Sequence, residues 1–230
     1  MGGQACVLYG AAEFSRDVDL AILPDPDNLE RLRGALADLD AEVIAVPPFG
    51  REHLEEGLAV HFRCRHPDAR GLRIDVMTRL RGVEPFSRLW ARRTTLQFEE
   101  GNLEVLSLPD LVASKKTQRD KDWPMVRRLV DVNYLTHREE PTPERVAFWL
   151  RELRSPELLV EAVRAHPADA AHACAERPLL RLATREHFGS GALARALRDE
   201  EETVRREDEA YWRPLKETLE RLRRERARGE

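Results

Sequence analysis

The chain has 230 residues, 35% of them charged, and a formal net charge of −4. This length allows one large domain or two small ones, and the balanced charge gives no overall signal for nucleic acid or a membrane surface. No apolar run approaches the roughly 20 residues of a membrane span, and the first residues do not show a basic stretch followed by an apolar one. Three scattered cysteines do not suit a disulfide framework or a zinc site. We therefore expect a cytoplasmic protein that does not bind membranes.

The first twenty residues combine a glycine pair with two closely spaced carboxylates. Gly2 and Gly3 precede apolar residues at helical spacing over 4–14, and glycines at a helix start let backbone N–H groups approach a phosphate. A strand is predicted over 17–23. Asp17 and Asp19 share one face of it, where two adjacent carboxylates repel each other unless a cation lies between them. The run therefore predicts a site for Mg²⁺ or Mn²⁺ beside a phosphate-binding turn.

Strand and helix patterns alternate in the rest of the first half. Leucines at helical spacing predict a helix over 29–39, and a strand follows over 42–46. Two alternating runs, 58–66 and 72–80, surround the turn PDARG and predict an antiparallel hairpin. Asp75 falls on the polar face of the second run, in a strand otherwise suited to burial.

The second half changes to helical periodicity. Ser107 followed by Leu108, Pro109 and Asp110 is typical of a helix start. We expect further helices from Asp122, over 141–153, from about 157, from about 178 and over 193–226. The change of period puts the predicted domain boundary near residue 105, giving domains of 1–105 and 106–230.

Two segments resemble the nucleotidyltransferase superfamily. GGQACVLYGAAEFSRDVDL, residues 2–20, is similar without a gap to the signature GGxAxxx[HY]GxxRx[TS]xDxDL of a bacterial branch, with Glu13 where that branch has arginine. LPDLVASKKTQRDKD, residues 108–122, is similar to the family helix carrying LIxxKxxxRxKD. The family has an apolar strand before the glycine pair, whereas Met1 directly precedes Gly2 here. We expect that the true start lies upstream; the alternative is a sheet without that edge strand.

The resemblance implies an α/β (α+β) fold, with a mixed nucleotidyltransferase sheet and flanking helices followed by a helical C-terminal domain. It implies metal-dependent transfer of a nucleoside monophosphate from a nucleoside triphosphate (NTP) to an acceptor. The implied catalytic and metal-binding residues are Asp17, Asp19 and Asp75, and the implied nucleotide-binding residues are Gly2, Gly3, Ser15, Lys115 and Arg119. Asp75 would complete one metal's ligands and help to deprotonate the acceptor hydroxyl.

Several of these residues have a second interpretation. Asp75 could instead pair with Arg63 or Arg73 on the strand surface. Lys116 is the competing choice for the helical lysine, and Asp122 could be a helix cap. The spacing of His61, Cys64 and His66 suggests a metal site, but His61 and Cys64 would point to opposite faces of a strand, which weakens that interpretation.

The acceptor is the least determined part of the prediction. Arginines are frequent over 63–93, which suits a polyanionic acceptor such as RNA, the nucleotide itself, or simply a solvated strand face. Resemblance to toxin-type nucleotidyltransferases of toxin–antitoxin systems makes tRNA the leading acceptor and an antitoxin a candidate partner. The alternative is a non-catalytic nucleotide- or partner-binding module with a degenerate fold, which Glu13 and the terminal position of the glycine pair favour.

Overall fold

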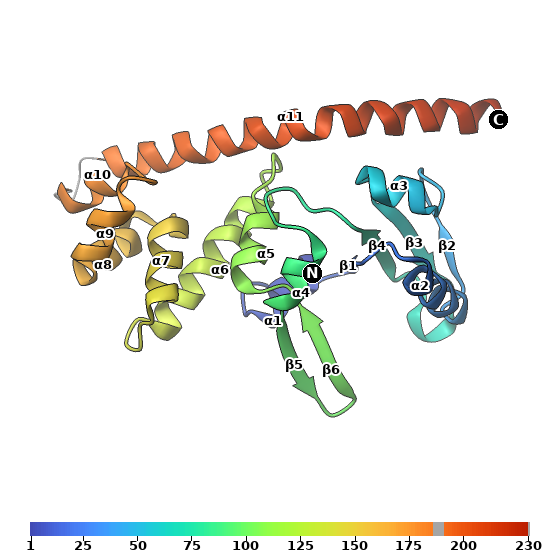
Figure 1. Ribbon diagram of the computed structural model, residues 1–230, viewed down its shortest axis with the longest axis horizontal. Helices are drawn as coiled ribbons and strands as arrows, with labels where there is room; N and C mark the ends of the chain where they lie inside the picture. Colours follow the sequence, from blue (N-terminus) through green and yellow to red (C-terminus); the bar gives the residue numbers. More distant parts are fainter. Residues whose placement is uncertain (186–190, 230) are drawn as a thin grey trace. The chain divides into compact units, whose positions relative to one another are not determined.

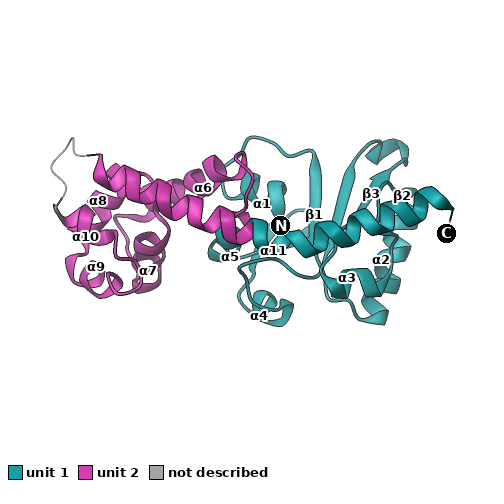
Figure 2. Cartoon of the chain, turned by 90° about the horizontal axis from the view of Figure 1, so that it is seen from above, with its two compact units in different colours: residues 1–114, 209–230 teal, residues 115–208 magenta. Residues whose placement is uncertain are grey.

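A computed structural model describes residues 1–185 and 191–229. The chain divides into two compact units: the first comprises residues 1–114 and 209–230, and the second comprises residues 115–208 (Figure 2). The chain passes from the first unit to the second after Ser114 and returns to the first within the long helix α11 (Ala192–Arg228).

The first unit contains a mixed sheet of four strands (Figure 1). Its strands are β1 (Asp17–Ala21), β2 (Ala41–Val43), β3 (Val60–Cys64) and β4 (Arg73–Met77), in the order β1-β4-β3-β2. β1 is parallel to β4, and the other two pairs are antiparallel. The predicted hairpin is therefore confirmed as β3 and β4, with the 3-10 turn η1 (Pro67–Ala69) between them. The α+β class with a mixed sheet is also confirmed.

One face of this sheet is buried. Val60, Phe62, Cys64, Ile74 and Val76 alternate along β3 and β4 and face the core. Leucines of α2 (Pro26–Asp38) and α3 (Arg51–Glu56) pack against them. The alternation leaves the intervening polar residues of the same strands on the opposite face, and Asp75, one of the predicted carboxylates, is among them.

Several predicted elements are shorter than expected, and α1 and β2 show why. α1 (Gly2–Leu8) ends well before residue 14, because Gly10 has φ +74°, a left-handed conformation that terminates a helix. β2 stops at Val43 instead of 46; the Ile44 N–H still bonds the His61 carbonyl at 3.0 Å, but Pro47 and Pro48 have no N–H with which to continue the pairing.

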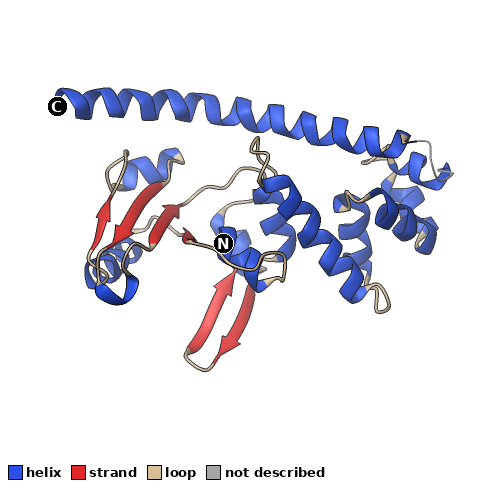
Figure 3. Cartoon of the chain, turned by 180° about the vertical axis from the view of Figure 1, so that it is seen from behind, coloured by secondary structure: helices blue, strands red, loops and turns tan. Residues whose placement is uncertain are grey.

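The remainder of the first unit contains elements that no sequence pattern predicts. They are α4 (Phe86–Ala91) and a separate hairpin of β5 (Thr94–Phe98) and β6 (Gly101–Val105), shown apart from the main sheet in Figure 3. α5 (Leu108–Lys115) follows, and the Asp110 N–H donates to Ser107 Oγ at 3.4 Å, which confirms Ser107 as its cap.

Helices build the second unit. They are α6 (Asp122–His137), α7 (Pro143–Glu152), α8 (Pro156–Ala165), α9 (Pro167–Ala173), α10 (Leu180–Arg185) and the first part of α11. No sequence pattern predicts α9; the other helices match their predicted positions closely. Trp149 and Tyr134 are buried in contact, with ring centroids 5.1 Å apart. None of the described helices is both long and apolar enough to cross a membrane.

Candidate functional site

The polar face of the four-stranded sheet brings Asp19, Asp75 and His61 into one row. Asp19 on β1 is the register partner of Asp75 on β4, and Asp75 is in turn opposite His61 on β3. Directly paired residues of adjacent strands point to the same face. The predicted Asp19 and Asp75 are therefore neighbours, although α2, β2, α3 and β3 separate them in the chain.

A second row lies beside the first, two residues earlier along β1 and β4. Asp17 is the register partner of Arg73, and Arg73 is opposite Arg63 on β3. Because side chains two residues apart share a face, Asp17 and Asp19 point to the same side, as predicted. Two carboxylates on β1 thus adjoin two arginines on the next two strands.

Both carboxylate oxygens of Asp75 are engaged by protein groups. Arg73 donates from Nε to Oδ1 at 2.8 Å and from Nη2 to Oδ2 at 2.9 Å, and His61 Nδ1 lies 2.8 Å from Oδ1. Asp75 is only 8% exposed. Burial acts to raise the pKa of this carboxyl, but the hydrogen bonds from His61 and Arg73 outweigh it and hold the pKa below its usual value. Arg73, one of the two arginines considered for this pairing, is therefore the partner.

His61 is a contact that the sequence analysis did not find. The signal was available in the predicted hairpin, because residues opposite each other on antiparallel strands share a face. The same alternation separates His61 from Cys64, which lies in the core and is 1% exposed. The structure thus agrees that these two residues do not form a common metal site.

The glycine pair lies against Asp19. The Gly3 N–H donates to Asp19 Oδ2 at 3.3 Å, and a Cβ on Gly2 would come within 1.8 Å of the same oxygen. Gly2 also has φ +68°. A Cβ on Gly3 would lie 2.3 Å from Ser15 Oγ. Three residues predicted to bind the nucleotide, Gly2, Gly3 and Ser15, therefore lie with the predicted metal ligand Asp19 at the start of α1, and neither glycine has room for a side chain.

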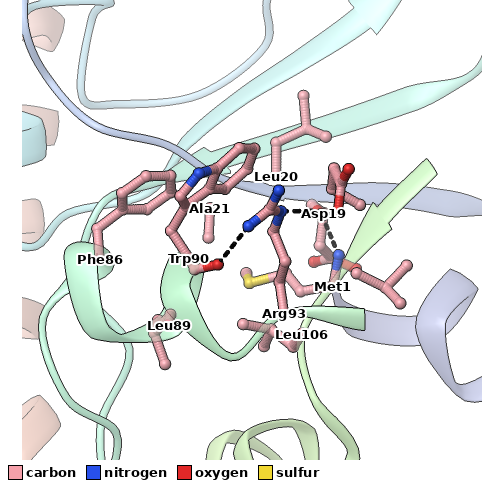
Figure 4. Close-up of a pocket in the computed structure, with 11 residues that line it drawn as sticks. Met1, Asp19, Leu20, Ala21, Phe86, Leu89, Trp90, Arg93 and Leu106 are labelled. Carbon is pink, nitrogen blue, oxygen red and sulfur yellow. Dashed lines mark hydrogen bonds and ion pairs between the residues drawn. The ribbon is translucent and has the colours of Figure 1, made fainter. Parts of the chain in front are cut away.

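A small pocket adjoins Asp19 (Figure 4). Its volume is about 90 Å³, which accommodates a few water molecules but is far below the size of a nucleotide site. The Met1 amino group donates to the Asp19 carbonyl at 2.8 Å on one side. On the other side the guanidinium of Arg93 lies 4.1 Å from the centre of the Trp90 ring and donates to Glu104 at 2.8 Å. Neither Trp90 nor Arg93 was singled out from the sequence.

The side chains fit a metal ion at two of the three predicted carboxylates. No hydrogen bond or ion pair to the Asp17 carboxylate occurs within the described ranges, and Asp19 accepts one backbone N–H. Two such oxygen ligands on one strand face suit Mg²⁺. Asp75 does not fit as a third ligand in this arrangement, because both of its oxygens are occupied by Arg73. Across residues 1–185 and 191–229, no three His, Cys, Asp or Glu side chains are grouped so as to hold a metal ion.

The other predicted site residues belong to the second unit. Lys115 is half-buried at the last position of α5. Its neighbour Lys116 lies 2.5 Å from a carboxylate oxygen of Glu152. Arg119 donates from Nε to Asp122 Oδ2 at 2.7 Å. The roles of Lys115 and Arg119 in nucleotide binding remain predictions.

Asp122 is buried at the start of α6 and serves a local structural purpose. Besides Arg119, the hydroxyl of Thr117 donates to it at 2.5 Å. The Trp123 indole N–H donates to the Thr117 carbonyl at 2.8 Å. Thr117 is therefore hydrogen-bonded through both its hydroxyl and its carbonyl. These contacts favour the structural interpretation of Asp122 over a catalytic one.

Comparisons with known proteins give no relative: no family model matches the chain, and no curated protein or solved structure is significantly similar to it. Any function proposed for the chain therefore depends on the arrangement of the site and on the resemblance of its motifs.

Proposed function

We propose that the protein is a metal-dependent nucleotidyltransferase that moves a nucleoside monophosphate from an NTP to an acceptor. The observation that carries the proposal is the meeting of the Gly2–Gly3 pair with Asp19, next to the carboxylate of Asp17, which has no hydrogen bond or ion pair among the described residues. Residues far apart in the signature thus lie in one place. A coincidental match of motif letters gives no reason for them to be close.

The two halves of this arrangement have complementary roles. Gly2 and Gly3 keep the backbone open to a phosphate, while Asp17 and Asp19 present carboxylate oxygens to a cation. Carboxylates alone would repel a triphosphate, so the site requires a divalent ion between them. When bound, Mg²⁺ supplies positive charge that offsets charge developing on the phosphate oxygens.

Asp75 can act in the reaction only if its contact with Arg73 opens. A carboxylate with a lowered pKa and two bonds to a guanidinium is a weak proton acceptor. We therefore propose that bound triphosphate competes with Asp75 for Arg73, whose planar guanidinium suits phosphate oxygens as well as a carboxylate. In that case Asp75 becomes available to the acceptor hydroxyl.

We further propose tRNA as the acceptor class and an antitoxin as a partner, on the strength of the toxin-type resemblance. The exposed Arg63, in the row beside Asp17, provides positive charge next to the carboxylates. The second candidate function is a non-catalytic nucleotide- or partner-binding module. The occupied state of Asp75 favours that candidate, because a catalytic carboxylate should be open to substrate.

Titration calorimetry with Mg²⁺ and each NTP tests binding. We expect one NTP to bind, and Asp17→Asn and Asp19→Asn to weaken its binding by at least tenfold, since each removes a metal-binding charge. Asp68→Asn is the matched control, because Asp68 is an exposed aspartate between β3 and β4. Equal affinity in all four proteins would overturn the proposal.

Transfer of α-phosphate-labelled NTP to total tRNA then separates the two candidate functions. Label on tRNA that depends on Asp17 supports the transferase. Tight Mg²⁺-dependent binding without transfer to tRNA, small hydroxylated molecules or the protein itself supports the binding module.

A further inference from the structure

The second unit contains a cavity of about 670 Å³. This volume is within the usual range of small-molecule sites. Residues of α7, α9 and α11 line it, together with Lys116, Arg154 and Arg177, and every one of them belongs to the range 115–208. The cavity is therefore a feature of the helical unit alone.

Charged side chains with little exposure gather along one side of this cavity. Lys116 pairs with Glu152 at 2.5 Å, and Arg154 and Arg177 both pair with Glu200, at 2.8 and 2.9 Å. Glu152, Arg154 and Arg177 are each 5% exposed. Three cations of low exposure thus share two carboxylates, and the more exposed Arg151 also donates to Glu152, at 3.3 Å. Positive charge is therefore in excess among these groups, where solvent screening is weak.

Arg154 is the cation with bonding capacity left over. Arg177 uses all three nitrogens of its guanidinium, because it donates to Glu200 from Nε and Nη2 and to the carbonyls of Leu150 and Leu153 at 2.9 Å each. Arg154 donates from Nη1 to Glu200, whereas its buried Nε–H has no acceptor among the described residues. A buried donor without an acceptor disfavours the folded state, so such groups are rare unless a ligand completes them.

Lys116 is affected by the same excess of charge. Burial lowers the pKa of its ammonium, Glu152 opposes that effect, and the positive charges of Arg154 and Arg177 lower the pKa further. A bound anion would relieve this repulsion and satisfy the Arg154 Nε–H at once. Both consequences follow from one added negative group.

We propose that this cavity binds a small molecule through a carboxylate or phosphate group that accepts a hydrogen bond from Arg154 Nε. Asp169 and Glu176 are exposed at the lining, so the part of the ligand remote from its anionic group carries amine or hydroxyl donors. The excess of positive charge among the buried groups favours a ligand with an anionic group.

Thermal unfolding of the full chain at constant ionic strength tests this proposal, with sodium chloride replaced stepwise by inorganic phosphate in one series and by acetate in another. We expect at least one anion to raise the unfolding midpoint by about 3 °C at roughly ten times its dissociation constant. The series that responds distinguishes phosphate from carboxylate. No rise beyond that in chloride would overturn the proposal.

Arg154→Met should abolish the rise. This variant keeps Lys116 and Arg177 matched to two carboxylates, so it should fold. Arg164→Met, at an exposed arginine of α8, is the matched control and should retain the rise. Ala173→Phe fills the cavity without changing a charge and should also abolish it. A rise of unchanged size in both Arg154→Met and Ala173→Phe would show that the anion binds elsewhere. Asp17→Asn should retain the rise, which makes this result independent of the proposed transferase activity.

Discussion

Arg73 holds Asp75 from the same strand, two residues away, through two hydrogen bonds of 2.8 and 2.9 Å, one to each carboxylate oxygen. Such a paired contact between guanidinium and carboxylate is among the stronger polar contacts in proteins, because it is charge-assisted and geometrically matched. It also fixes the carboxylate that the motif assigns to catalysis. Whether this contact stabilises the fold, regulates the site or does both can be measured with single variants.

Arg73→Met should lower the free energy of unfolding by about 1–3 kcal/mol, because it leaves the buried Asp75 carboxylate without its main partner. Urea denaturation measures the change. Arg65→Met is the control, since Arg65 is an exposed arginine of the same hairpin that pairs with Glu42 at the surface, and it should change the free energy by less than about 0.5 kcal/mol. Equal losses of unfolding free energy in the two variants would show that the Arg73–Asp75 contact stabilises the fold no more than a surface ion pair does.

Asp75 should make stability depend on pH in acid. Its pKa in the folded protein is lowered, so its contribution is complete above the unfolded value of about 3.9 and is lost as pH falls through the lower, folded value. Urea midpoints at pH 5, 4 and 3 should therefore fall more steeply in the wild type than in Asp75→Asn. Asp68→Asn should follow the wild type, and parallel curves for Asp75→Asn and wild type would contradict the assignment.

Gly2→Ala should destabilise the fold by about 1–3 kcal/mol, through the left-handed backbone and the displacement of Asp19 by the new Cβ. The same displacement should weaken Mg²⁺–NTP binding. Gly34→Ala is the matched control, because Gly34 lies within α2 and a Cβ added there would meet no atom within 4 Å, so this change should stabilise by about 0.5–1 kcal/mol. Thermal unfolding and calorimetry measure the two effects.

Lys116→Met should cost about 1–3 kcal/mol, because the buried Glu152 would keep only its longer contact, at 3.3 Å, with the exposed Arg151. The double variant Lys116→Met, Glu152→Met should recover most of the loss, since an apolar pair can replace a buried ion pair. A double-mutant cycle in urea measures the coupling. Additive losses would show that the two side chains do not depend on each other.

The sequence predicted the parts of the fold that depend on local periodicity. Alternation along β3 and β4 located the hairpin and placed Asp75 on its polar face, and Ser107 marked the start of α5. The sequence analysis did not predict the hairpin β5–β6, because its residues are mostly exposed and each strand has only two alternating apolar residues, Leu96 and Phe98 in β5 and Leu103 and Val105 in β6. The sequence analysis did not predict α9, because this helix is short and rich in alanine and polar residues.

For the candidate site, the motif indicated candidate residues but not which of them contact each other. The proximity of Gly2 to Asp19 depends on a left-handed backbone angle, and the contact of Asp75 with His61 depends on strand register. The Arg154 Nε–H is buried without a described acceptor, and that burial depends on how the helices of the second unit pack. These contacts depend on the tertiary structure, and no single segment of the sequence predicts them.

The strand order β1-β4-β3-β2 also has a kinetic consequence. β3 and β4 are joined by a short turn and can pair early, whereas β1 must close a loop containing α2, β2, α3 and β3 before Asp19 can reach Asp75. Asp75, His61 and Arg73 can therefore come together in the isolated hairpin, while Asp17 and Asp19 join them only with the parallel pairing. During refolding, protection of β4 amides from hydrogen exchange should precede protection of β1, and the capacity to bind nucleotide should appear with the later event.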